Sequence, residues 1–158
     1  MPSENQIEVH GHQGKLLFDV IKGGYCIHEG KLAVSVEGER LEDGEFPTCA
    51  YFCIFDFPVS ENLKVGDNLV YERPKNSLYQ FYNLYEFEDQ PKAHAYFGFH
   101  VAYIQTIWAI TKIEGDEIWF SMEAIHDDID QYDGKARTMP TCGTFRLQPR
   151  SIAELWIP

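Results

Sequence analysis

One nine-residue stretch, HDDIDQYDG at 126–134, holds four aspartates and a histidine and contains no lysine or arginine. Side chains of this kind could bind a cation, contribute to an active site or form a negative surface for a positive partner. A calcium loop of the EF-hand type needs acids at positions 1, 3 and 5, glycine at 6 and glutamate at 12. Counted from Asp128, the fifth position is Tyr132 and the twelfth is Met139. The spacing therefore argues against a calcium loop and favours an exposed acidic segment.

Histidine and cysteine patterns give no stronger signal for a transition metal. His10 and His12 form an H-x-H pair that would point to one face of a strand, and we interpret them as surface histidines. Cys49 and Cys53 fall within one apolar run and Cys142 stands alone, without the paired C-x₂₋₄-C turns typical of zinc sites. We therefore predict no metal and no cofactor, and we expect Cys49 and Cys53 to pack in the core and all four cysteines to be reduced thiols.

The sequence carries no catalytic signature that we can defend. There is no G-x-S-x-G nucleophile elbow and no glycine-rich phosphate loop. Cys142, His126 and Asp128 could be assembled into a nucleophile, a base and an acid, but nothing local supports that arrangement. A hydrolase or isomerase with His126 or His100 as its base is kept as an alternative. We expect a binding protein rather than an enzyme.

Charge is the most informative feature of the sequence. The net charge is −12, from 25 acidic and 13 basic residues. This excess repels phosphate backbones and anionic membranes, so we expect neither a nucleic acid nor a membrane as partner. Eight acids and no basic residue lie between Lys112 and Lys135, and the segment 37–45 holds five acids and one arginine. Concentrated negative charge on turns favours a basic protein partner.

The surrounding pattern predicts strands that would hold these turns in place. Aromatic residues make up 15% of the chain, and they pack well on the pleated surface of a sheet. Glycine turn signals recur between apolar runs at short intervals, as in a sandwich or barrel. They are Gly23-Gly24, Glu29-Gly30, Glu37-Gly38, Asp43-Gly44, Gly66-Asp67, Gly115-Asp116 and Asp133-Gly134. We predict a mainly β fold, a single-domain antiparallel sandwich or barrel over residues 1–158 with little helix.

Individual strands follow from the apolar runs. The segment 48–57 is apolar on both faces, which predicts a central strand that is covered on both sides. Residues 105–113 and 117–125 are β-rich and are joined by EGD, which predicts a hairpin. A further strand is expected at 78–88. Helix is plausible only at 94–107 and in a turn after Ser151, where a final edge strand is the alternative.

Aromatic side chains also allow a second function. In the run HAYFGFHVAY at 94–103, Tyr96 and His100 would share one face of a strand. A barrel lined by Tyr96, His100 and Trp108 could hold a small apolar molecule. A small-molecule-binding β-barrel is therefore the alternative to a protein-binding module.

No signal peptide is visible at the N-terminus and no apolar run is long enough to span a bilayer, so we expect a cytoplasmic protein. In size, acidity and absence of a catalytic signature, the chain resembles bacterial immunity proteins. That resemblance covers properties and no specific motif, and it implies an inhibitor that neutralises a basic, nuclease-like toxin. The expected primary contact is Asp127, Asp128, Asp130, Tyr132 and Asp133, and the expected secondary contact is Glu42, Asp43 and Glu45.

Overall fold

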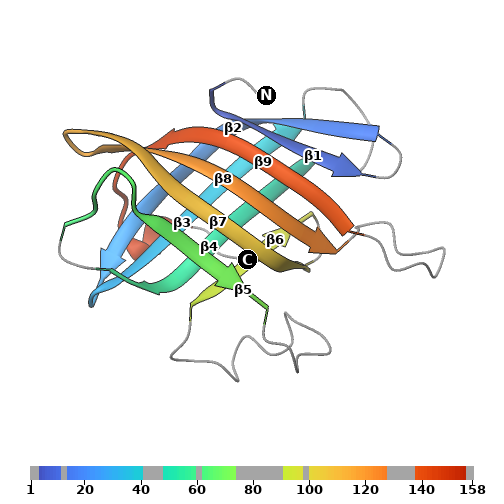
Figure 1. The fold of residues 1–158 in the computed structure, drawn as a ribbon. Helices are drawn as coiled ribbons and strands as arrows, with labels where there is room; N and C mark the ends of the chain where they lie inside the picture. Colours follow the sequence, from blue (N-terminus) through green and yellow to red (C-terminus); the bar gives the residue numbers. More distant parts are fainter. Residues whose placement is uncertain are drawn as a thin grey trace.

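The structure is a computed structural model that describes residues 4–11, 14–40, 48–59, 62–73, 91–97, 100–127 and 138–155. Of residues 94, 100, 102 and 127, only the backbone is described. This part of the chain forms nine β-strands and one 3₁₀ turn, and it contains no α-helix (Figure 1). The strands are β1 (Gln6–Gly11), β2 (Gly14–His28), β3 (Lys31–Arg40), β4 (Cys49–Pro58), β5 (Asn68–Glu72), β6 (Lys92–Tyr96), β7 (His100–Glu114), β8 (Glu117–Asp127) and β9 (Thr138–Leu147), and the turn is η2 (Ile152–Glu154).

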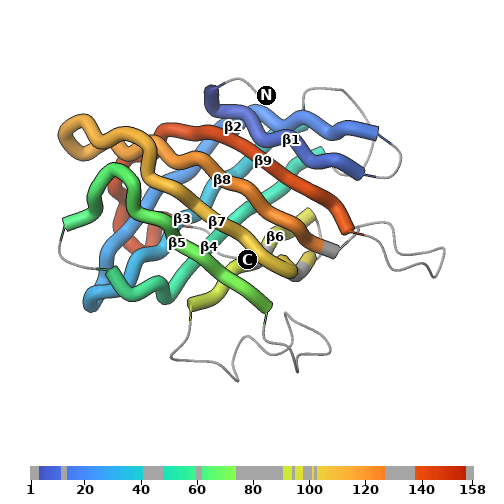
Figure 2. Tube along the Cα trace, in the orientation of Figure 1, coloured from blue at the N-terminus to red at the C-terminus, as the bar shows by residue number. Residues whose placement is uncertain are grey.

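All nine strands belong to one antiparallel sheet that curls into a nearly closed barrel (Figure 1 and Figure 2). A ring of pairings runs β1–β2–β3–β4–β6–β7–β8–β9 and returns to β1. Its two shortest ladders are β1–β9, with four residue pairs, and β6–β7, with three. Strand β5 pairs with the part of β7 that follows the β6 ladder. The prediction of a mainly β, antiparallel fold is confirmed, and the form is the barrel.

Aromatic side chains fill the barrel interior. Successive residues of a strand point to opposite faces, so each strand sends every second side chain inward. Trp108 packs against Phe145 with ring centroids 5.3 Å apart. Phe97 contacts Phe18 and Phe52 at 6.2 and 5.6 Å, and all five of these rings are 1% exposed or less. Burial of one such side chain stabilises the fold by about 1.5–3 kcal/mol, so this interior is the main source of stability.

An irregularity in β7 decides which of its residues face inward. The register with β8 shifts between Tyr103 and Gln105, and a bulge of this kind reverses the alternation of faces. Tyr103 is fully buried before the shift, and Thr106 and Trp108 are buried after it. The shift therefore brings Tyr103 and Trp108 into the same interior, although an unbroken strand would place them on opposite faces.

Two glycine-containing dipeptides that the sequence predicts as turns lie inside strands instead. Gly23–Gly24 is in the middle of β2 and Glu37–Gly38 is near the end of β3. A Cβ atom on Gly38 would lie 2.8 Å from Cβ of Phe18. The correction has a steric reason, because glycine in a strand allows a neighbour to approach closely. The predicted turns at Glu29–Gly30 and Gly115–Asp116 are confirmed.

Most of the predicted elements are found. Strands β7 and β8 form the predicted hairpin. The prediction that β4 is covered on both faces is met only in part, since Phe52 and Cys53 are fully buried but Tyr51 on the outer face is half-buried. The helical alternative for 94–107 is wrong, because its described residues belong to β6, β7 and a bend. The helical turn after Ser151 is confirmed as η2. The predicted strand at 78–88 lies outside the described residues.

Candidate functional site

The residues predicted to contact a partner fall almost entirely outside the part of the chain that the structure describes. These are Asp128, Asp130, Tyr132 and Asp133 in the first acidic segment, and Glu42, Asp43 and Glu45 in the second. Asp127 is the last residue of β8, with only its backbone described. The structure therefore leaves these contacts as predictions, but it places the strands from which both segments start.

Strand direction brings the starting points of the two acidic segments to one end of the barrel. Neighbouring strands of the ring are antiparallel, so β1, β3, β6 and β8 all run the same way. Arg40 ends β3 immediately before the segment 41–47, and Asp127 ends β8 immediately before 128–137. We call the end of the barrel at which β1, β3, β6 and β8 finish the acidic end. The turns at Glu29–Gly30 and Gly115–Asp116 lie at the opposite end.

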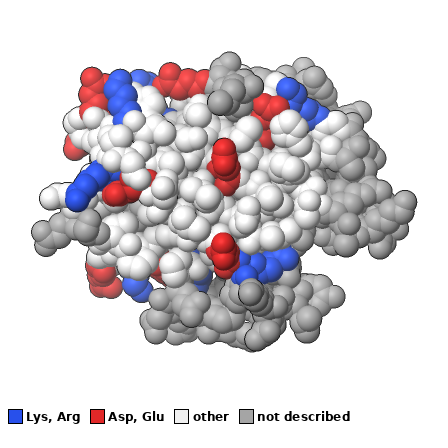
Figure 3. All heavy atoms as spheres, in the orientation of Figure 1, with Lys and Arg blue, Asp and Glu red and all other residues white. Residues whose placement is uncertain are grey.

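The barrel wall between the two ends carries few charges on the face seen in Figure 3. Over β5, β7, β8 and β9 this face is mostly uncharged, and acidic and basic side chains gather mainly along its margins. Val70 and Ile107 form a cross-strand pair there, 50% and 41% exposed. The negative excess of the chain is therefore not spread evenly over the barrel surface.

Two of the three residues of the predicted ligand pocket, Tyr96 and Trp108, do not line one common space. Trp108 lies in the filled interior, where its indole N–H donates to the Thr106 hydroxyl at 2.9 Å. Tyr96 ends β6 between the buried residues Ala95 and Phe97 and faces the outside, where its ring packs edge-on against Tyr51 at 6.2 Å. The side chain of His100 is not among those described. Tyr96 and Trp108 are thus on opposite faces of the barrel wall.

A polar groove of about 810 Å³ runs along the outside of β2, β3 and β4. Cross-strand pairing places Lys22 beside Glu37 and Glu37 beside Tyr51. Burial and a hydrogen bond with Glu37 raise the pKa of Tyr51 to about 12. Arg146 and Arg150 also line this groove. The charges along the groove are therefore mixed, with basic and acidic side chains in its lining.

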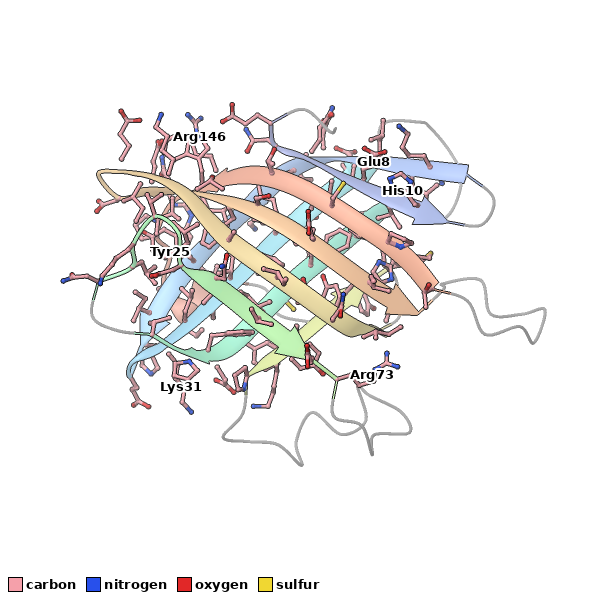
Figure 4. The ribbon with its side chains drawn as sticks, viewed as in Figure 1. Glu8, His10, Tyr25, Lys31, Arg73 and Arg146 are labelled. Atoms are coloured by element: carbon pink, nitrogen blue, oxygen red, sulfur yellow. The ribbon has the colours of Figure 1, made fainter. Side chains whose placement is uncertain are left out.

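A more specific arrangement lies on the outer side of β1 and β9. Glu8 and His10 are two residues apart in β1 and share its outer face (Figure 4). Cys142 is the cross-strand partner of Glu8 on β9. One carboxylate oxygen, one imidazole nitrogen and the thiol sulfur of these three residues lie within 4.8 Å of one another. We call Glu8, His10 and Cys142 the mixed-donor cluster.

Charged residues on the two adjacent strands, Lys15 on β2 and Glu123 on β8, surround the mixed-donor cluster. Oε1 of Glu8 lies 3.0 Å from Nζ of Lys15 and 3.0 Å from Nε2 of His10. The hydrogen bond from Lys15 holds the pKa of Glu8 below its usual value. Burial, and then the nearby carboxylate of Glu8, raise the pKa of the Cys142 thiol. Glu123 pairs with Cys142 from the other side, on β8.

A hollow of about 310 Å³ opens beside this cluster on the outside of β7, β8 and β9. Its lining includes His10 and Cys142 together with Glu123 and Ile107. The cluster therefore offers oxygen, nitrogen and sulfur donors at the edge of an open space, an arrangement that could hold a metal ion.

Sequence reasoning missed this cluster and placed one cysteine wrongly. His10 was interpreted as a surface histidine, and Cys142 as a cysteine standing alone. All four cysteines are free thiols; Cys53 is buried as predicted, but Cys49 is exposed because it is the first residue of β4. The available signal was the alternation E-x-H at 8–10, which puts an acid and a histidine on one face.

Comparison with known proteins yields no match to any family model, curated protein or solved structure. Among the residues that the structure describes, no helix is long and apolar enough to cross a membrane.

Proposed function

We propose that the protein is an acidic protein-binding module whose acidic end contacts a basic partner, in the manner of an immunity-type inhibitor that covers a nuclease-like toxin. The observation that carries this proposal is the common direction of β3 and β8, which starts both acid-rich segments from one end of the barrel. The segments 41–47 and 127–137 together hold seven acids and two basic residues.

Electrostatic attraction acts on a partner that covers this end of the barrel. At physiological ionic strength, charges separated by more than about 8 Å are largely screened from each other, and β3 and β8 lie on opposite sides of the ring. Each acidic segment therefore attracts the partner charges nearest to it, and a partner that covers this end meets both segments. A field of this kind raises the association rate with a cationic partner by about 10- to 1000-fold. A nuclease suits this surface, because it must present cationic side chains to bind phosphate.

The test compares two variants that lose the same charge at opposite ends. The acidic-end variant replaces Asp128, Asp130 and Asp133 by Asn, and the control replaces Glu29 and Glu114 by Gln and Asp116 by Asn. Glu29 and Glu114 are suitable controls because their side chains are 83% and 69% exposed. Each protein is immobilised and used to capture binders from a lysate of the native host, and captured proteins are identified by mass spectrometry.

We expect the wild type and the control variant to capture the same basic protein, and the acidic-end variant to capture much less of it. With the isolated partner, the acidic-end variant should associate about tenfold more slowly at low salt, with a flatter dependence on salt concentration. Equal losses in both variants would show that only total charge matters. Undiminished binding by the acidic-end variant would refute the proposed surface.

A further inference from the structure

We propose that the mixed-donor cluster of Glu8, His10 and Cys142 binds a divalent transition-metal ion of the zinc class on the outer side of the barrel. This site lies in the barrel wall and uses none of the residues to which partner binding is assigned. It goes beyond the proposed function and does not rest on it.

The geometry of the cluster needs little adjustment to hold an ion. Zinc binds oxygen and nitrogen ligands at about 2.0–2.2 Å and sulfur at about 2.3 Å. Tetrahedral ligands at those distances are separated from one another by about 3.5 Å. The three donor atoms here already lie within 4.8 Å of one another. Because Glu8 and Cys142 are cross-strand partners and His10 is two residues from Glu8 on the same face of β1, side-chain rotation alone can close the difference.

The donor set selects the class of ion. Thiolate and imidazole ligands suit zinc and other late first-row metals, whereas calcium and magnesium take oxygen ligands. On binding, the Cys142 thiol loses its proton to solvent as the metal–sulfur bond forms, while Glu8 and the imidazole of His10 bind in their carboxylate and neutral forms. A redox partner is not needed, because no ligand or ion changes oxidation state.

The ammonium group of Lys15 competes with a metal ion for the carboxylate of Glu8. The Glu8 side chain is only 7% exposed, and Lys15 and His10 both reach the same carboxylate oxygen at 3.0 Å. The Lys15 side chain is 54% exposed, so its ammonium group can move into water when an ion takes its place beside Glu8. The lysine therefore neutralises a buried carboxylate in the absence of metal and weakens metal binding.

Three protein ligands leave one tetrahedral position for a further ligand. The hollow of about 310 Å³ beside the cluster is lined by His10 and Cys142. The fourth position opens toward this space and is taken by water. Zinc sites with three protein ligands and a bound water are the open type, as distinct from fully closed structural sites.

Cobalt(II) titration of the reduced protein tests the site directly, because thiolate coordination produces a charge-transfer absorption band and tetrahedral geometry strengthens the visible bands. We expect one equivalent of cobalt to bind and zinc to displace it. Cys142→Ser should abolish the charge-transfer band, whereas Cys49→Ser, which alters an exposed cysteine on β4, should keep it. His10→Asn should weaken binding by at least about tenfold, the loss that even supporting residues of metal sites cause.

Two further outcomes decide the proposal. His10 has a side chain that is 51% exposed, so His10→Asn leaves the core intact and remains informative if Cys142→Ser unfolds. Lys15→Met should tighten cobalt binding, because the competing ammonium group is gone. Absence of a charge-transfer band in the wild type, or a band that survives in Cys142→Ser and disappears in Cys49→Ser, would overturn the assignment.

Discussion

Substitution of Tyr103 by Phe is predicted to stabilise the fold, whereas most substitutions destabilise a protein. Its side chain is fully buried in the barrel interior, and its hydroxyl has no hydrogen-bond partner among the described residues. Burial raises the pKa of Tyr103 well above its usual value. A buried hydroxyl without a partner costs about 1–3 kcal/mol. Tyr103→Phe removes that oxygen and keeps the ring, which packs edge-on against His126 with centroids 5.9 Å apart.

We therefore expect Tyr103→Phe to raise the free energy of unfolding by about 1 kcal/mol, which corresponds to about 2–4 °C in Tm for a chain of this length. Urea denaturation with an unchanged m-value would measure the effect. Tyr25→Phe is the matched control, because the Tyr25 hydroxyl donates to the backbone oxygen of Asp116 at 2.6 Å. That control should lose about 0.5–1.5 kcal/mol. If Tyr103→Phe destabilises the protein as much as the control does, the Tyr103 hydroxyl has a partner in the folded state and the reasoning fails.

Three other substitutions test separate parts of the barrel. Gly143→Ala would place a Cβ 2.8 Å from Cγ1 of Ile7 where β1 and β9 close the ring, and denaturation should show a loss of about 1–3 kcal/mol. Asp56 lies 2.7 Å from Nζ of Lys92, whose side chain is 8% exposed; Asp56→Asn tolerates the positive φ of 60° at this position and should cost about 1–3 kcal/mol in the same assay. The pKa of Tyr51 is about 12 against an ordinary value of 10.0, so its stabilising contribution is complete below pH 10.0 and is lost as the pH rises to 12. Tyr51→Phe should flatten the alkaline fall in stability; an unchanged pH profile would contradict this assignment.

Local signals in the sequence predict the strands whose pattern is unambiguous. The hairpin of β7 and β8 has β-rich segments on both sides of a short glycine-containing turn. Both features can be recognised from the sequence without knowledge of the fold. The turn after Ser151 was predicted with Ser151 as its N-cap, and the Glu154 carboxylate accepts hydrogen bonds from the Ser151 backbone N–H at 3.1 Å and hydroxyl at 2.8 Å. Strand β1 was not predicted, because six residues with two inward apolar side chains give too short a pattern.

Glycine shows why the predicted boundaries failed in β2 and β3. The sequence pattern of Gly23–Gly24 is the same as that of a turn, but in the structure the reason for glycine is distant in the chain. A Cβ on Gly23 would lie 2.7 Å from the carbonyl oxygen of Ser35 and 3.1 Å from Cδ2 of Leu147. Leu147 reaches this position because the barrel closes and brings β9 near β2. A requirement for glycine that arises from closure of the barrel cannot be recognised from the neighbouring residues in the sequence.

The mixed-donor cluster escaped prediction for the same physical reason. One half of the cluster can be recognised in the sequence, because Glu8 and His10 are two residues apart and therefore share one face of a strand. The other half depends on the pairing of β1 with β9, which joins the two ends of the chain and exists only when the other strands have formed the ring. Likewise, each acidic segment is visible as a charge pattern, but their common end follows only from the direction of β3 and β8. In this barrel, the residues that become neighbours at a site depend on how the ring closes and on which strands run in the same direction. The spacing of residues in the sequence specifies neither the closure nor the strand directions.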